Sequence, residues 1–158
     1  MNKTKLKFLI FVQLLTPIFG ASPDPIFSEN GMVVSTSKQA SEAGVQILKK
    51  GGNAIDAAVA IGFALAVTSP SNGNIGGGGF LVATFADGRI ITQDHREKAP
   101  SLSHRDMFLS GSGDVIDGMS LYSRASSGVP GTVDGLVGIF RDHGSGAVSL
   151  KQVLAPAI

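Results

Sequence analysis

The chain has 158 residues, the size of one typical domain, with a formal net charge of +1 and 16% charged residues. The near-neutral charge and the 6% aromatic content argue against nucleic acid as a partner and against an aromatic platform for bases. The sequence contains no cysteine, which excludes disulfides, thiolate zinc sites and a cysteine nucleophile.

The chain opens with a basic segment followed by an apolar one. Three lysines lie within residues 2–7, an apolar run covers residues 6–19, and small residues follow at positions 20–22. This order is typical of a secretory signal peptide, which we predict for residues 1–21. The run is shorter than the ~20 residues that span a bilayer, so no stable membrane span is expected; an uncleaved anchor is the alternative. The expected location is outside the cytoplasm: secreted, with the periplasm as the compartment.

An irregular lead-in at residues 26–30 and a short apolar strand at residues 31–35 are expected before the first helix. Thr36 is predicted to cap that helix, with Gln39 three residues on in a capping box. Apolar residues then recur at helical spacing until Gly51-Gly52, which ends the helix. The pattern predicts an amphipathic helix lying on a surface.

A second helix is predicted from Ala54 to Val67, capped by Asn53 and with Asp56 in its first turn. It is apolar on nearly every side, which is typical of a helix buried all round. Its small residues allow neighbouring elements to approach closely. More protein must therefore cover this helix than the first helix supplies.

A β-hairpin is predicted next. The glycines Gly76–Gly79 lead into an apolar strand at residues 80–85, Asp87-Gly88 suggests a two-residue turn, and the return strand runs from Arg89 to about Arg96. Both strands are mostly apolar on both faces, which predicts a sheet packed on each side. The glycines lack the following lysine and helix of a phosphate loop, so close backbone packing is favoured over nucleotide binding.

Three further elements are expected after the hairpin. Residues 103–108 could form a short helix, and a turn at residues 128–132 leads into an apolar helix from Val133 to about Asp142. Ser149 is predicted to cap a last helix, Leu150 to Ile158. We expect an α+β domain and place it at residues 26–158.

The strongest candidate site is the strand end, where five ionisable residues, Asp94-His95-Arg96-Glu97-Lys98, follow one another. Strand alternation places Asp94 and Arg96 on one face, and His95 and Glu97 on the other. A guanidinium beside a carboxylate that can orient it suits bidentate binding of a substrate carboxylate. A solvated charge cluster is the alternative, and it is the commoner use of such residues.

The other motifs in the sequence are weaker indications of function. The Ser-x-x-Lys at residues 35–38 lacks the companion motifs of serine β-lactamases, and an ordinary helix cap explains it. His95, His104 and His143 are scattered without carboxylates at ligand spacing, so neither a metal nor another cofactor is expected. The chain contains no convincing nucleophile.

Four motifs in order resemble the γ-glutamyltransferase family. They are Gly-Gly-Asn-Ala-Ile-Asp-Ala-Ala at 51–58, Asn-Ile-Gly-Gly-Gly-Gly-Phe at 74–80, Asp-His-Arg-Glu-Lys-Ala-Pro at 94–100 and Gly-Val-Pro-Gly-Thr at 128–132. The resemblance runs from about residue 31 to residue 158. Any one motif would be weak, but the four together are specific.

The resemblance implies an N-terminal-nucleophile hydrolase with an αββα sandwich, incomplete in this chain. Members of the family are precursors that cut themselves into a large and a small subunit. The threonine freed at the start of the small subunit attacks the γ-glutamyl amide of glutathione and related compounds, and passes the acyl group to water or an amino acid. Its own α-amine serves as the base.

For this chain, the resemblance implies the first part of the large subunit. Arg96 matches the arginine of the family's Arg-Glu-x-Ala-Pro motif, which binds the donor α-carboxylate, and Asp94 is its possible orienter. No catalytic residue of the family is matched, so the chain is expected to be inactive alone. The expected partners are γ-glutamyl compounds such as glutathione, the rest of the large subunit and the small subunit. The alternatives are a related acylase acting on cephalosporins or poly-γ-glutamate, or a truncated, non-catalytic secreted domain.

Overall fold

The computed structural model describes residues 24–158, so the predicted signal peptide at residues 1–21 lies outside the described residues. The chain divides into two compact units, residues 1–30 and residues 31–158. In the first unit, the described residues 24–30 are exposed and contain neither helix nor strand, in agreement with the predicted lead-in. All further structure described below belongs to the second unit.

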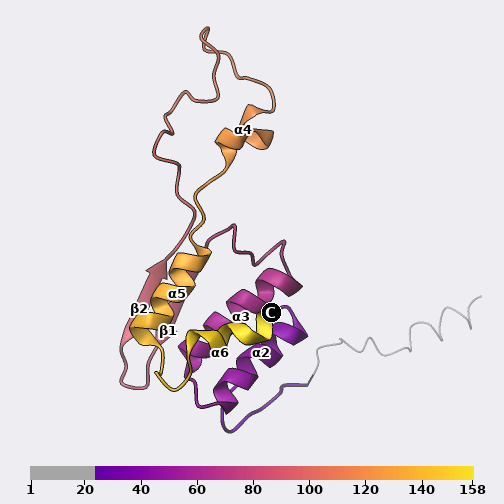
Figure 1. Cartoon of the computed structure of the whole chain (residues 1–158), viewed down its shortest axis with the longest axis vertical. Helices are drawn as coiled ribbons and strands as arrows, with labels where there is room; N and C mark the ends of the chain where they lie inside the picture. Colours follow the sequence, from indigo (N-terminus) through magenta and orange to yellow (C-terminus); the bar gives the residue numbers. More distant parts are fainter. Residues whose placement is uncertain (1–23) are drawn as a thin grey trace, which may run out of the picture. The chain divides into compact units, whose positions relative to one another are not determined.

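Helix α2 (Lys38–Lys49) packs along α3 (Ala54–Thr68) (Figure 1). Ser37, not Thr36, caps α2: its hydroxyl accepts a hydrogen bond from the backbone N–H of Ala40 at 3.4 Å. The predicted strand at residues 31–35 is wrong: within residues 24–158 the sheet consists of β1 (Phe80–Thr84) and β2 (Ile90–Asp94), and residues 31–35 are not part of it.

The N-terminus of α3 forms the predicted cap. Asn53 and Asp56 make a complete capping box, in which the Asp56 carboxylate accepts from the Asn53 N–H at 2.8 Å. Asp56 is fully buried, and it also accepts from the N–H of Ser145 at 3.1 Å. The Asn53 side chain donates to the carbonyl oxygen of His143 at 2.9 Å. The start of α3 is therefore tied to the chain that follows helix α5 (Thr132–His143).

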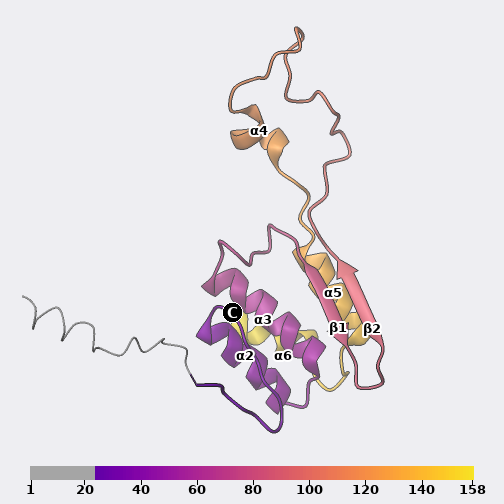
Figure 2. The same ribbon diagram turned by 180° about the vertical axis from the view of Figure 1, so that it is seen from behind.

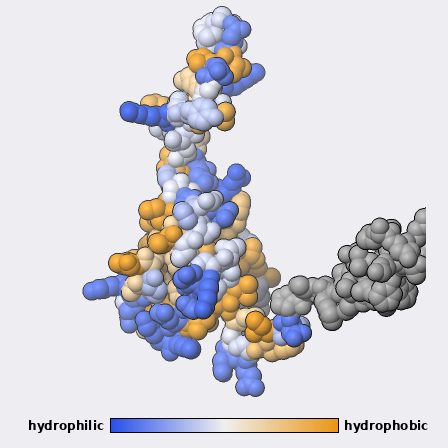
Figure 3. Space-filling view, turned by 90° about the vertical axis from the view of Figure 1, so that its right-hand side faces the viewer, coloured by the Kyte–Doolittle hydropathy of each residue, from blue (hydrophilic) through white to orange (hydrophobic). Residues whose placement is uncertain are grey.

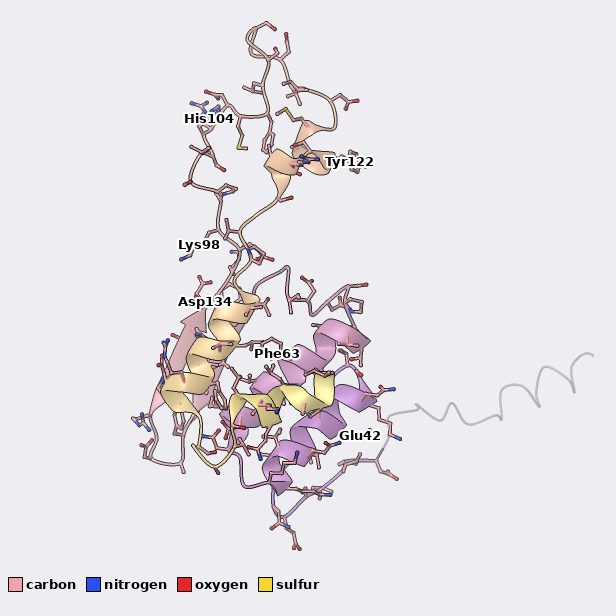
Figure 4. All side chains as sticks on the ribbon, in the orientation of Figure 1. Glu42, Phe63, Lys98, His104, Tyr122 and Asp134 are labelled. Carbon is pink, nitrogen blue, oxygen red and sulfur yellow. The ribbon has the colours of Figure 1, made fainter. Side chains whose placement is uncertain are left out.

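Helix α3 is the central element, but it is not buried on every side as predicted. Its buried residues pack against α2, α5 and α6 (Leu150–Leu154), whereas Val67 near its end is 65% exposed. Phe63 of α3 packs against the main core and lies on the side of α3 that faces α5 (Figure 4).

Within residues 24–158, no helix combines the length and the apolar content needed to cross a bilayer. The main core is made of Ile47, Ile55, Val59, Ala60, Leu136, Ile139, Val148 and Val153.

The hairpin consists of β1 (Phe80–Thr84) and β2 (Ile90–Asp94), which pair antiparallel with Phe80 opposite Asp94 (Figure 2). The Phe85 N–H donates to the Arg89 carbonyl at 2.9 Å, and Gly88 adopts a positive φ of 85°. The loop therefore has three residues rather than the predicted two, with glycine at the left-handed position. The Arg89 guanidinium donates to Asp87 at 2.7 Å and holds the pKa of that carboxyl below its usual value.

Only one face of the hairpin is covered by the described residues, so the predicted packing on both sides is wrong for this part of the chain. Leu81, Ala83 and Ile91 pack on the helical core. On the opposite face, Phe80, Val82 and Ile90 are 67%, 71% and 66% exposed. Figure 3, which views the molecule from the right-hand side of Figure 1, shows further apolar residues at the surface.

Residues 99–128 extend away from the ends of β2 and α5 (Figures 1 and 2). Paired hydrogen bonds between the backbones of Lys98 and Val129 close the base of this excursion. The helix predicted at residues 103–108 is wrong: the segment forms turns, with Leu102 90% exposed just before it. A short helix needs packing to form, and this segment has little. The helical elements of the excursion at residues 99–128 are α4 (Met119–Tyr122) and the 3-10 turn η1 (Arg124–Ser126).

The last two helices agree closely with the sequence. Helix α5 begins at Thr132, one residue before the predicted start. Ser149 caps α6 in a box with Gln152, as predicted, but α6 gives way to the 3-10 turn η2 (Ala155–Ala157) instead of running on to Ile158. Pro156 explains the change, because proline lacks the N–H that would continue an α-helix.

Candidate functional site

A pocket with a cavity volume of about 340 Å³ opens between the end of β2 and the start of α5. Lys98 at the base of the excursion and Asp134 in the first turn of α5 both line it (Figure 4). Arg96 lines it as well, beside the glycine-rich segment that enters β1. The pocket thus combines two cations with the acids Asp94 and Asp134.

Two glycine segments enclose the backbone that carries Arg96. A Cβ atom on Gly78 would lie 2.6 Å from the Cα of Arg96 and 2.7 Å from the N of Glu97. A Cβ on Gly131 would collide with the carbonyl oxygen of His95 as well. The N–H groups of Gly131 and Thr132 both donate to the Gly77 carbonyl, at 2.9 and 3.0 Å. Close backbone packing, as predicted for the glycine run, therefore fixes the main chain at residues 95–97.

The ladder of the hairpin also continues one residue beyond the end of β2. The His95 N–H donates to the Gly79 carbonyl at 3.0 Å, and the Gly79 N–H donates back to His95 at 3.3 Å. Arg96 therefore leaves the sheet immediately after its last hydrogen-bonded pair. The ladder therefore holds the backbone of the residue directly before Arg96.

Asp94 contacts Arg96 through the main chain. The Asp94 Oδ1 atom accepts from the backbone N–H of Arg96 at 3.0 Å. Among the ion pairs of the described residues, none joins the Asp94 carboxylate to the Arg96 guanidinium. Asp94 therefore contacts the main chain of Arg96, and its expected role as an orienter of the guanidinium stays a prediction.

The aromatic neighbour of Arg96 was missed in the sequence analysis. The Cζ atom of Arg96 lies over the ring of Phe80, 5.7 Å from the ring centroid, within the range of a cation–π contact. Phe80 faces Asp94 across the ladder, two residues from Arg96. Side chains at such diagonal positions share a face and reach each other when one of them is long. The hairpin register was therefore the signal that could have found this pair.

His95 turns to the other side of β2, as alternation predicts. Its ring packs against Gly79 and Gly135, and its buried Nδ1 atom has no hydrogen-bond partner. Gln93, on the same face, donates to the Gly135 carbonyl at 3.1 Å. Within residues 24–158, no three His, Cys, Asp or Glu side chains gather closely enough to hold a metal ion.

Arg96 lines the pocket from a backbone that glycines hold closely, and its guanidinium is of a kind that binds small carboxylates. The planar guanidinium offers paired N–H donors that match a carboxylate, and Lys98 adds positive charge nearby. The pocket contains no Ser, Thr or Cys side chain to act as a nucleophile.

Comparison with known proteins gives a consistent result. The family model described as gamma-glutamyltranspeptidase matches residues 40–158. The chain is 46% identical over 160 residues to the glutathione hydrolase proenzyme of Pseudomonas sp. (strain A14), with 99% of this chain covered. It is 46% identical over 133 residues to the glutathione hydrolase proenzyme of Escherichia coli (strain K12). The chain spans only 28% and 23% of the lengths of these two relatives.

Solved structures agree with the sequence comparisons. The fold matches the crystal structure of Helicobacter pylori gamma-glutamyltranspeptidase with a TM-score of 0.78 at 46% identity. That match covers 84% of this chain and 38% of the other. The chain belongs to the γ-glutamyltranspeptidase family, and it corresponds to the N-terminal part of larger members.

Proposed function

We propose that this chain is the donor-binding, N-terminal part of the large subunit of a γ-glutamyltransferase that hydrolyses glutathione. One observation carries the proposal: Arg96, in the family's Arg-Glu-x-Ala-Pro motif, lines a pocket on a backbone held by glycines. The guanidinium binds the α-carboxylate of the γ-glutamyl donor. The remainder of the polypeptide completes the pocket and supplies the nucleophile.

In this mechanism the chain positions the donor and another part of the enzyme reacts with it. Holding the amino-acid end of the donor fixes the γ-carbonyl relative to the attacking hydroxyl, which converts an encounter into a reaction within one complex. The nucleophile is the threonine at the start of a small subunit, with its own α-amine as base. The acyl group passes from that threonine to water or to an amino acid.

The complete protein is proposed to form the αββα sandwich of N-terminal-nucleophile hydrolases. The exposed outer face of the hairpin, with Phe80, Val82 and Ile90, is consistent with a sheet that further protein covers. Both relatives described above are named proenzymes, which supports maturation by self-cleavage here. Export by the signal peptide at residues 1–21 would place the enzyme in the periplasm.

A hybrid proenzyme tests the proposal. In it, this chain replaces the matching 160 residues of the Pseudomonas sp. (strain A14) proenzyme. The expected result is self-cleavage into two subunits and hydrolysis of γ-glutamyl-p-nitroanilide, whereas the 158-residue chain alone shows neither. A hybrid that matures but leaves γ-glutamyl-p-nitroanilide intact would contradict the proposal, and so would turnover by the isolated chain.

An acylase of the same family is the second candidate function. The chain is 37% identical over 146 residues to the acylase ACY 1 proenzyme of Pseudomonas sp. (strain V22). It also matches the cephalosporin acylase of Bacillus halodurans with a TM-score of 0.67 at 28% identity. Because glutaryl amides lack the donor α-amine, a hybrid that prefers glutaryl-p-nitroanilide to the γ-glutamyl compound would favour the acylase.

The glycine packing around Arg96 predicts the effect of Gly78→Ala in the hybrid proenzyme. Every close neighbour of the added Cβ is backbone, so residues 95–97 must shift. The expected result is a donor KM raised at least tenfold while Arg96 itself is unchanged, because small displacements of a positioning group are costly. Gly111→Ala is the control, since nothing lies within 4 Å of its added Cβ. Equal kinetics for the two variants would show that the backbone at Gly78 does not set the position of Arg96.

A further inference from the structure

We propose that Phe80 is a positioning residue for the donor site: its ring holds the Arg96 guanidinium in the orientation that receives the carboxylate. The inference rests on the proposed function, in which Arg96 binds the donor. Phe80 closes the glycine-rich motif at residues 74–80, and the proposal gives its side chain a role. Phe80 touches Arg96, and it acts on the substrate only through that contact.

The first ground is geometric. The Arg96 Cζ atom lies 5.7 Å from the centroid of the Phe80 ring, at a distance where the ring quadrupole attracts a cation. The ladder fixes Phe80 opposite Asp94, and the next pair, Gly79 with His95, is hydrogen-bonded in both directions. The two side chains therefore meet because the register of the sheet places them together.

The second ground is that the Arg96 guanidinium takes part in none of the ion pairs within residues 24–158. Asp94 bonds the backbone N–H of Arg96. A long, exposed arginine side chain samples many rotamers, and ordering it on binding costs affinity. A ring that already favours one orientation removes part of that cost.

The third ground is that stacking and carboxylate binding use different parts of the guanidinium. A ring that lies over the face of the guanidinium leaves free the N–H donors that pair with a carboxylate, because these point outward along the edge of the planar group. Phe80 can therefore keep its contact while the donor is bound. An acidic residue in the place of Phe80 would instead compete with the donor carboxylate for the same N–H groups.

The test uses the hybrid proenzyme with Phe80→Leu, Phe80→Tyr and Val82→Ala. Leucine keeps the apolar bulk but removes the π face, so the KM for γ-glutamyl-p-nitroanilide should rise about fivefold with kcat unchanged within twofold. Tyrosine keeps the π face and should restore the wild-type KM. Val82 is the control because it lies on the same face of the hairpin as Phe80 but two residues further from Arg96. Its variant should leave the KM unchanged.

A second donor separates positioning from a general structural effect. 4-Aminobutyryl-p-nitroanilide lacks the α-carboxylate, so Phe80→Leu should not change its kcat/KM. Equal losses with both donors, or a Phe80→Leu variant with wild-type KM beside an impaired Arg96→Ala, would overturn the inference and leave the proposed function standing. If Arg96→Ala itself keeps the wild-type KM, the proposed function fails, and the role of Phe80 fails with it.

Discussion

Arg96→Ala in the hybrid proenzyme is expected to raise the donor KM by about 30-fold to several thousand-fold, equivalent to about 2–5 kcal/mol of lost binding. The loss is expected to be large because the donor carboxylate would lack its charged partner in the pocket that the remainder of the polypeptide is proposed to complete. In the proposed mechanism the guanidinium contacts the donor both before and during reaction, so kcat should change much less than KM. Steady-state kinetics with γ-glutamyl-p-nitroanilide provide the measurement.

Arg96→Lys supplies the matched control. Lysine keeps the positive charge but offers no planar pair of donors, so it should recover only part of the lost affinity. Lys98→Ala, which removes the other cation lining the pocket, should have a smaller effect than Arg96→Ala. A donor KM that stays at the wild-type value in Arg96→Ala would remove Arg96 from the binding site.

Asp56→Ala is expected to be the most damaging substitution for stability, lowering the free energy of unfolding by about 3–5 kcal/mol. The carboxylate is fully buried and accepts from the N–H groups of Asn53 and Ser145 at 2.8 and 3.1 Å. Alanine would remove the acceptor that both N–H groups share, and with it half of the capping box of α3. Thermal unfolding of the hybrid proenzyme should show a midpoint several degrees lower.

Glu42→Ala is the control for this substitution. Glu42 is exposed on α2 and pairs with Lys38 at 3.7 Å, a surface ion pair worth little. Hydrogen exchange adds a local measurement, because Asp56→Ala should loosen the start of α3 and the segment after α5 before the rest of the molecule. Midpoints that are equal in Asp56→Ala and Glu42→Ala would contradict the role given to the buried carboxylate.

The sequence predicted the elements whose signals are local. The Asn53–Asp56 and Ser149–Gln152 boxes were found because a cap and its partner lie three residues apart. The hairpin was found because Asp87-Gly88 interrupts two apolar runs. The strand-end position of Arg96 followed from alternation and from the charged residues that close β2.

The remaining features depend on contacts that sequence spacing does not encode. The carboxylate of Asp56 reaches Ser145, 89 residues further along the chain, and only the fold brings them together. The strand expected at residues 31–35 failed because a strand needs a partner, which its own sequence cannot supply. Phe80 was missed as a neighbour of Arg96 because their contact requires the register of the hairpin, which the three-residue loop sets.

The most direct test of the central claim is a crystal structure of the matured hybrid proenzyme with L-glutamate bound. We expect both α-carboxylate oxygens to lie about 2.7–2.9 Å from guanidinium nitrogens of Arg96, with the guanidinium still over the ring of Phe80. A glutamate whose α-carboxylate binds elsewhere, with the Arg96 side chain directed into solvent, would contradict the account.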